Sequence, residues 1–113
     1  MQDRQEDVSS SGAIIEDEIV DIEEYARSGC RPPRARRYRI RIDRQHFVVE
    51  QPQITGRELL KLAGKTPPES FMITQKLSGG EARRIGLNEA VDLTTPGIER
   101  FMTLPLDQTE GGI

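Results

Sequence analysis

One short helix with clear signals at both ends lies between two groups of strand-like segments, and this order constrains the fold most. Thr55 and Glu58 have the spacing of a capping box, in which both side chains accept hydrogen bonds from free backbone N–H groups at a helix start. Gly64, followed by two prolines, provides the stop. The apolar residues between these signals form one stripe: Leu59, Leu60 and Ala63. The sequence therefore predicts a short helix that packs through this stripe.

Segments with the pattern of strands flank this helix on both sides. Residues 38–43 alternate between apolar and charged side chains, the period of two that is typical of a strand with one buried face. A tight turn at 43–46 and the apolar residues 47–49 predict its hairpin partner. Beyond the helix, three more strands and a short approach to the last are predicted: 71–74, 83–87, 91–93 and 99–104.

The order strand, strand, helix, strand, short strand, strand predicts an α+β domain over residues 38–105. In such a domain the helix packs across one face of a mixed sheet. A domain of this size is small but feasible. The residues expected in its core are Tyr38, Ile40, Ile42, Phe47, Val49, Leu59, Leu60, Phe71, Ile73, Leu93 and Phe101.

Residues 1–37 form an extension ahead of this domain, and residues 106–113 form a flexible tail after it. The first twelve residues are polar and rich in serine, so we expect them to be disordered. In the next stretch, apolar residues fall on one face of a helix: Ile15, Ile19, Ile22 and Ala26. An isolated helix of this length is marginal in water, so the prediction is a helix at 13–28 that forms when its isoleucine face is covered.

Charge is separated along the chain rather than present in excess. The net charge is −3, which identifies no partner. Residues 16–24 hold six acids and no base, whereas residues 27–41 hold seven arginines and no acid. No aromatic residues are interleaved in a nucleic-acid motif, so we expect these arginines to be solvated or to pair with the preceding acids rather than with phosphates.

Compartment and membrane association also follow from composition. The single cysteine, Cys30, excludes an internal disulfide and fits a reducing compartment. No apolar run approaches the ~20 residues that span a bilayer, and the amino terminus lacks the pattern of a signal peptide. A cytoplasmic protein is the expectation.

Catalytic chemistry finds little support in these residues. Cationic neighbours would favour the thiolate of Cys30, but the single histidine, His46, lies in a predicted turn, and no positioned base is apparent. One cysteine and one histidine do not form a zinc site of the usual spacing. Residues 78–80 lack the lysine of a phosphate-binding loop. We therefore expect no enzyme activity, no metal and no cofactor.

Several sequence segments, in this order, resemble the bacterial multiubiquitin-domain family. The matching segments are 38–43 (YRIRID), 54–60 (ITGRELL), 63–64 (AG), 91–93 (VDL) and 97–101 (GIERF). The resemblance implies a ubiquitin-like β-grasp fold for residues 38–105. It also implies partners: activating and conjugating enzymes, a deconjugating or processing protease, and protein targets. The biological setting it suggests is a bacterial ubiquitination-like pathway, with defence against phage as one such context.

The tail carries the reactive group that this resemblance implies. Gly111 and Gly112 lack side chains, so an activating enzyme could approach the backbone closely and attach the chain through its terminal carboxylate. Ile113 follows, so the expectation is a precursor that a protease cuts after Gly112. Residues 106–112 reach at most ~24 Å from the domain when extended. The side chains available for recognition by these enzymes are those of Leu106, Asp107, Thr109 and Glu110.

Three further surfaces are candidates for contact with partners. Ile15, Ile19 and Ile22 could bind a partner as a helix or, as the resemblance to short hydrophobic-acidic motifs suggests, as an added strand; the spacing favours the helix. An apolar patch on the sheet could use Met72, Leu77, Leu87, Met102 and Leu104, although half-buried core is the more frequent interpretation of such residues. A polymer linked through lysine would use one of the three that the chain contains: Lys61, Lys65 and Lys76.

Two alternatives to a protein modifier remain at this stage. A β-grasp sulfur carrier would convert its terminal glycine to a thiocarboxylate, and Ile113 argues against it. A β-grasp adaptor would bind partners without being conjugated. Mass spectrometry discriminates among the three.

Overall fold

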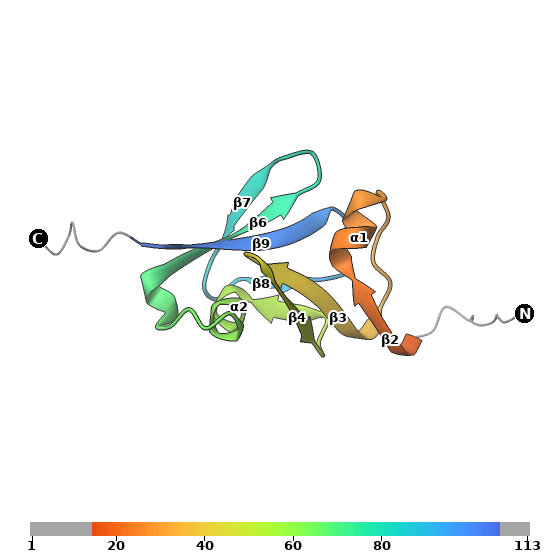
Figure 1. The fold of residues 1–113 in the computed structure, drawn as a ribbon, viewed down its shortest axis with the longest axis horizontal. Coiled ribbons are helices and arrows are strands. Elements are labelled where there is room, and N and C mark those ends of the chain that lie inside the picture. Colours follow the sequence, from red (N-terminus) through yellow and green to blue (C-terminus); the bar gives the residue numbers. More distant parts are fainter. Residues whose placement is uncertain (1–14, 107–113) are drawn as a thin grey trace, which may run out of the picture.

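The structure, a computed structural model, describes residues 15–106, with side chains described from residue 19 onward. Within this range a mixed six-stranded sheet forms the body of the molecule (Figure 1). Strand β3 pairs with β4, β2 and β9, and β6 then joins β9 to β7. The bounds are β2 (Ile15–Asp21), β3 (Ala35–Ile42), β4 (Gln45–Val49), β6 (Phe71–Leu77), β7 (Ala82–Ile85) and β9 (Ile98–Pro105).

Helix α2 (Gly56–Leu62) begins and ends where the sequence predicts. The Glu58 N–H donates to the Thr55 hydroxyl at 3.1 Å, and the Thr55 N–H donates to the Glu58 carboxylate at 2.9 Å, which completes the capping box. Gly64 ends the helical turn with a φ of +76°, a conformation that suits glycine. Short elements flank the helix: β5 (Gln53–Thr55), which pairs with β8 (Ala90–Asp92), and the 3₁₀ turn η1 (Pro68–Ser70).

Gly56, the first residue of α2, is required by a close approach of two backbones. A Cβ atom at this position would overlap the carbonyl oxygen of Gly86. The same contact brings the Gly56 N–H to the Glu89 carbonyl at 3.1 Å and the Arg57 N–H to the Leu87 carbonyl at 2.8 Å. The turn at 86–89 therefore satisfies N–H groups at the start of the helix that have no partner within it.

The core lies between α2 and the facing side of the sheet. Most of the predicted core is buried, with Tyr38, Leu59, Leu60, Leu93 and Phe101 fully enclosed. Each such side chain stabilises the fold by about 1.5–3 kcal/mol relative to an exposed position. Two predicted core residues are only partly buried and pack at its margin: Phe47 and Phe71. Residues from outside the predicted domain also join the core: Val20, Ile22 and Ala35.

The predicted helix over 13–28 is wrong for most of its length. Residues 15–21 form strand β2, and only Ile22–Arg27 form a helix, α1. β2 pairs in parallel with β3, so its backbone hydrogen bonds are made to a neighbouring strand. Asp21 of β2 lies opposite Arg39 of β3, so the pairing also brings opposite charges together. Asp21 then starts α1 by accepting a hydrogen bond from the Glu23 N–H at 3.0 Å.

The registers show that β2 and β9 share one edge of β3. Tyr38 and Arg39 pair with β4 and with β2 at the same time, so these two strands lie on opposite edges. Ile42 pairs with β4 and with Phe101 of β9, so β9 also lies opposite β4. β2 therefore fills the first part of this edge and β9 reaches only its end. Helix α1 follows β2 and packs against both β9 and β3 (Figure 1).

The folded body consequently extends beyond the boundary predicted at Tyr38. Ile22 is 1% exposed and belongs to the same core cluster as Tyr38 and Leu59. The loop that returns from α1 to β3 is fixed by the Tyr38 hydroxyl, which accepts from the Ala35 N–H at 2.8 Å and donates to the Pro33 carbonyl at 3.2 Å. Residues 15–37 are thus an integral part of the fold rather than an appended arm.

Candidate functional site

The end of β9 fixes the point from which the predicted reactive tail leaves the body. Pro105 pairs with Phe71, and the Leu106 N–H donates to the Ser70 carbonyl at 2.9 Å. In Figure 1 this end of β9 lies at the opposite end of the body from α1. The remaining tail residues of the sequence prediction lie outside the described residues: Asp107, Thr109, Glu110, Gly111, Gly112 and Ile113. Leu106 is therefore the one predicted recognition residue that the structure places.

An apolar patch lies on the outer face of the sheet beside this exit point. The register pairs Met72 with Leu104 and Thr74 with Met102, and residues directly opposite each other share a face. These four residues alternate with the buried Ile73 and Phe101, so they face away from α2. Leu104 is 57% exposed, while the two methionines and Thr74 are half-buried. We call Met72, Thr74, Met102 and Leu104 the sheet-face patch.

The structure resolves the ambiguity that the sequence left at this surface. Leu77 and Leu87 pack against the core cluster and do not belong to the sheet-face patch. Sequence reasoning missed two polar members of the same face, Thr74 and Arg84, which are cross-strand neighbours. Their parity within each predicted strand could have located them, because residues two apart share a face.

Basic side chains border the sheet-face patch. Arg84 of β7 is exposed and lies opposite Thr74. Farther along the same face, Lys76 lies opposite Arg100, and its ammonium is 3.6 Å from the Glu99 carboxylate. An apolar centre with a charged rim is the usual composition of a protein-binding surface.

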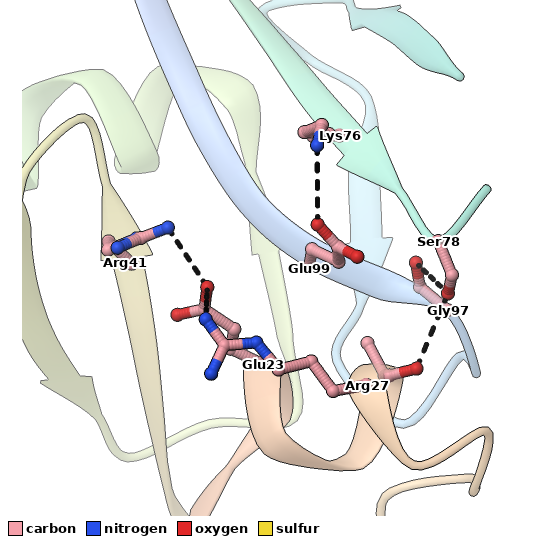
Figure 2. Close-up of polar contacts among 8 residues, drawn as sticks. Glu23, Arg27, Arg41, Lys76, Ser78, Gly97 and Glu99 are labelled. Carbon is pink, nitrogen blue, oxygen red and sulfur yellow. Dashed lines mark hydrogen bonds and ion pairs between the residues drawn. The ribbon is translucent and has the colours of Figure 1, made fainter. Parts of the chain in front are cut away.

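A charged cluster joins α1 to the same face at the other end of the sheet (Figure 2). The Glu23 carboxylate accepts a hydrogen bond from Arg27 at 3.0 Å and forms an ion pair with Arg41 at 2.9 Å, and its side chain is only 7% exposed. The Ser78 hydroxyl lies 3.5 Å from the Ala26 carbonyl and 3.3 Å from the Gly97 carbonyl. Two cations compensate the buried carboxylate, so the cluster anchors α1 to the sheet.

Three surface carboxylates have their pKa values held below the ordinary range by local hydrogen bonds. The Thr94 hydroxyl and N–H lower the pKa of Asp92. The backbone N–H of Gly86 and the Arg83 side chain lower the pKa of Glu89, and Arg57 does the same for Glu69. All three brace turns and helix ends, so they stabilise the scaffold.

The remaining predicted site residues are dispersed over the surface. Ile19 is 43% exposed, but Ile22 belongs to the core, so the hypothesis that Ile22 binds a partner is wrong for this fold. The side chain of Ile15 is outside the description. Lys61 is exposed on α2, whereas Lys65 lies over the Phe71 ring at 6.0 Å and Lys76 pairs with Glu99.

The described range contains neither a cluster of metal-ligating side chains nor a membrane-spanning helix. No group of three or more metal-ligating side chains occurs among residues 19–106. Cys30 is exposed, and its thiol lies 3.7 Å from the Ser28 carbonyl. Within the part of the chain that the structure describes, the helices are too short to cross a bilayer.

A hairpin, a capped helix across its face, and a final strand parallel to the first define a ubiquitin-like β-grasp fold. The family model for multiubiquitin matches residues 38–105, more than half of the chain, and the chain belongs to this family. The resemblance seen in the sequence is thereby confirmed. Comparison with curated proteins gave no match, and comparison with solved structures gave none either.

Proposed function

We propose that this chain is a ubiquitin-like protein modifier that acts in the bacterial cytoplasm. A protease cuts after Gly112 and releases the carboxylate of that residue. A cognate activating enzyme adenylates the carboxylate with ATP and passes it to a cysteine as a thioester. A conjugating enzyme then transfers it to an amine of a target protein, which displaces the thiol and forms an amide. The chain itself supplies the carboxylate that is attached to the target and performs no catalysis.

One observation carries this proposal: a multiubiquitin-family body whose last strand ends at Pro105, seven residues before Gly112. The hydrogen bond from Leu106 to Ser70 fixes the start of the tail at the surface. From there residues 106–112 can extend by at most ~24 Å, enough to carry the Gly112 carboxylate away from the body. The glycines would let the activating enzyme contact the backbone closely.

The sheet-face patch supports a role in recognition beside the tail. Leu104 is two residues from the end of the described chain and is 57% exposed. An enzyme that grips this surface would hold the tail at a fixed distance from its own active centre. Electrostatics favours an acidic partner surface here, because the rim carries Arg84 and Arg100.

The experiment is mass spectrometry of the tagged chain expressed in its native bacterium. Arg100 is the last trypsin site before the tail, so each modified lysine of a target would carry residues 101–112 after digestion. We expect this remnant with the natural chain and with a variant that lacks Ile113. We expect its loss with Gly112→Ala, which leaves the folded body unchanged.

The same measurement can refute the proposal in two ways. A mass gain equal to the replacement of one oxygen by sulfur at Gly112 would identify a sulfur carrier instead. An intact chain without any adduct, under conditions in which the pathway enzymes are expressed, would identify a non-conjugated adaptor.

A further inference from the structure

The six-stranded sheet has an open edge at β4. Within residues 15–106, β4 pairs with β3 alone. The hairpin has a two-residue turn, Asp43-Arg44, and the flanking pair of such a hairpin exchanges backbone hydrogen bonds. That exchange recurs at every second pair, so the N–H and C=O groups of His46 and Val48 point away from β3.

This edge lacks the features that normally protect an edge strand. Natural proteins place lysine, proline or a bulge on such strands to prevent pairing with another chain. Residues 45–49 contain neither lysine nor proline, and the pairing of β3 with β4 shows no shift in register. Val48 is 46% exposed at the centre of the free stretch. The opposite edge, β7, is one residue shorter and carries the exposed Arg83 and Arg84.

The surroundings of the open edge are cationic. Arg39 is exposed and lies opposite Val48 on the outer face. On the side of α2, Arg44 and Lys65 line a hollow of about 280 Å³. The nearest acid, Asp43, is already engaged, because its carboxylate accepts from the Thr103 N–H at 2.9 Å and the Thr103 hydroxyl at 2.7 Å. Glu50 follows Val49 at the end of the strand.

The chain already shows which kind of segment suits this arginine-bearing hairpin. The other edge of β3 is occupied by β2, an extended segment with isoleucine, valine and acids, and Asp21 lies opposite Arg39. We propose that the β4 edge binds an extended acidic and apolar segment of a partner protein, which adds a strand to the sheet. Backbone groups of His46 and Val48 would supply affinity, and the surrounding cations would select for acids. This proposal is independent of conjugation through Gly112.

The test is a titration of the full chain with a synthetic peptide that carries residues 13–24, the sequence type that β3 accepts. Amide shifts in ¹⁵N NMR should concentrate at residues 44–50. Replacing every acid of the peptide by its amide should abolish binding, and Arg44→Glu should weaken it. Because proline removes an outward N–H and blocks strand addition, Val48→Pro should reduce affinity at least about tenfold, whereas Val48→Ala should change it by about twofold.

The variants keep the proposal falsifiable. The Val48 N–H does not serve the β3 pairing, so Val48→Pro should keep its circular dichroism spectrum; Arg44→Glu provides a second variant that leaves the backbone of β4 intact. Equal binding by Val48→Pro and the natural chain would overturn the proposal. So would shifts confined to residues 15–27, which would show that the peptide displaces β2. Self-association through β4 without peptide binding would likewise reject it in favour of a second copy.

Discussion

The first and last strands of the described fold lie along the same edge of β3, yet they differ in how they are held. β9 touches β3 at a single bridge, Ile42 with Phe101, and pairs along most of its length with β6. β2 pairs with β3 over several residues and continues into α1, which packs on β9. The segment outside the family match therefore completes an edge that the matched body leaves largely open.

The largest expected effect separates two isoleucines of this N-terminal segment. Ile22→Ala removes a side chain that is 1% exposed, whereas Ile19→Ala removes one that is 43% exposed. Truncating a buried isoleucine costs about 2–5 kcal/mol, including the cavity it leaves. We therefore expect Ile22→Ala to lower the free energy of unfolding by about 3 kcal/mol, measured by urea denaturation. If Ile22→Ala lowered the free energy of unfolding by less than Ile19→Ala does, α1 would be dispensable for stability.

A smaller effect should distinguish two adjacent glutamates in α1. Glu23→Gln weakens the contacts to Arg27 and Arg41, while Glu24 is exposed and serves as the matched control. We expect Glu23→Gln to destabilise the protein by about 1–3 kcal/mol, because it leaves the Arg41 guanidinium partly buried without a full counter-charge. Glu24→Gln should stay within about 0.5 kcal/mol. Equal midpoints of thermal unfolding for the two variants would contradict an anchoring role for Glu23.

The smallest effect concerns acid sensitivity within the family-matched body. The folded-state pKa of Asp92 and of Glu89 lies below its ordinary value, so each carboxylate adds stability above its unfolded pKa, and this stability is lost as the pH falls through the folded pKa. In Asp92→Asn and Glu89→Gln, the free energy of unfolding should therefore fall less steeply as the pH decreases below about 4.5. Chemical denaturation at pH 7 and pH 3 measures this pH dependence. An unchanged slope would show that these hydrogen bonds do not persist in solution.

The body could be predicted from the sequence because its signals are local. The alternation of Tyr38–Ile42 and the capping box at Thr55 and Glu58 each specify an element without reference to distant residues. Ile15 and Ile19 wrongly indicated a helix, because a spacing of four fits a helix face and also one face of a strand. Pairing with an arginine-rich strand some 20 residues later decided between them, and such a partner cannot be read from a local window.

The candidate site could be predicted only in part for the same reason. Alternation indicates which side chains share a face within a strand, but the grouping of Met72 with Leu104 depends on the register between β6 and β9. The exclusion of Leu77 and Leu87 from that face likewise required the tertiary packing. The open edge at β4 is invisible in the sequence, because it is defined by a neighbour that the described chain does not provide.

The shared edge of β3 means that the unit recognised by sequence is smaller than the unit able to fold. A polypeptide trimmed to begin at Tyr38 would lose the buried side chains of Val20, Ile22 and Ala26. Its truncation would expose apolar core surface beside unpaired backbone groups of β3. Such a fragment should aggregate, or pair its open edge with a strand of another molecule. Any transplantation of this module into another protein must therefore carry the residues from Ile15 onward.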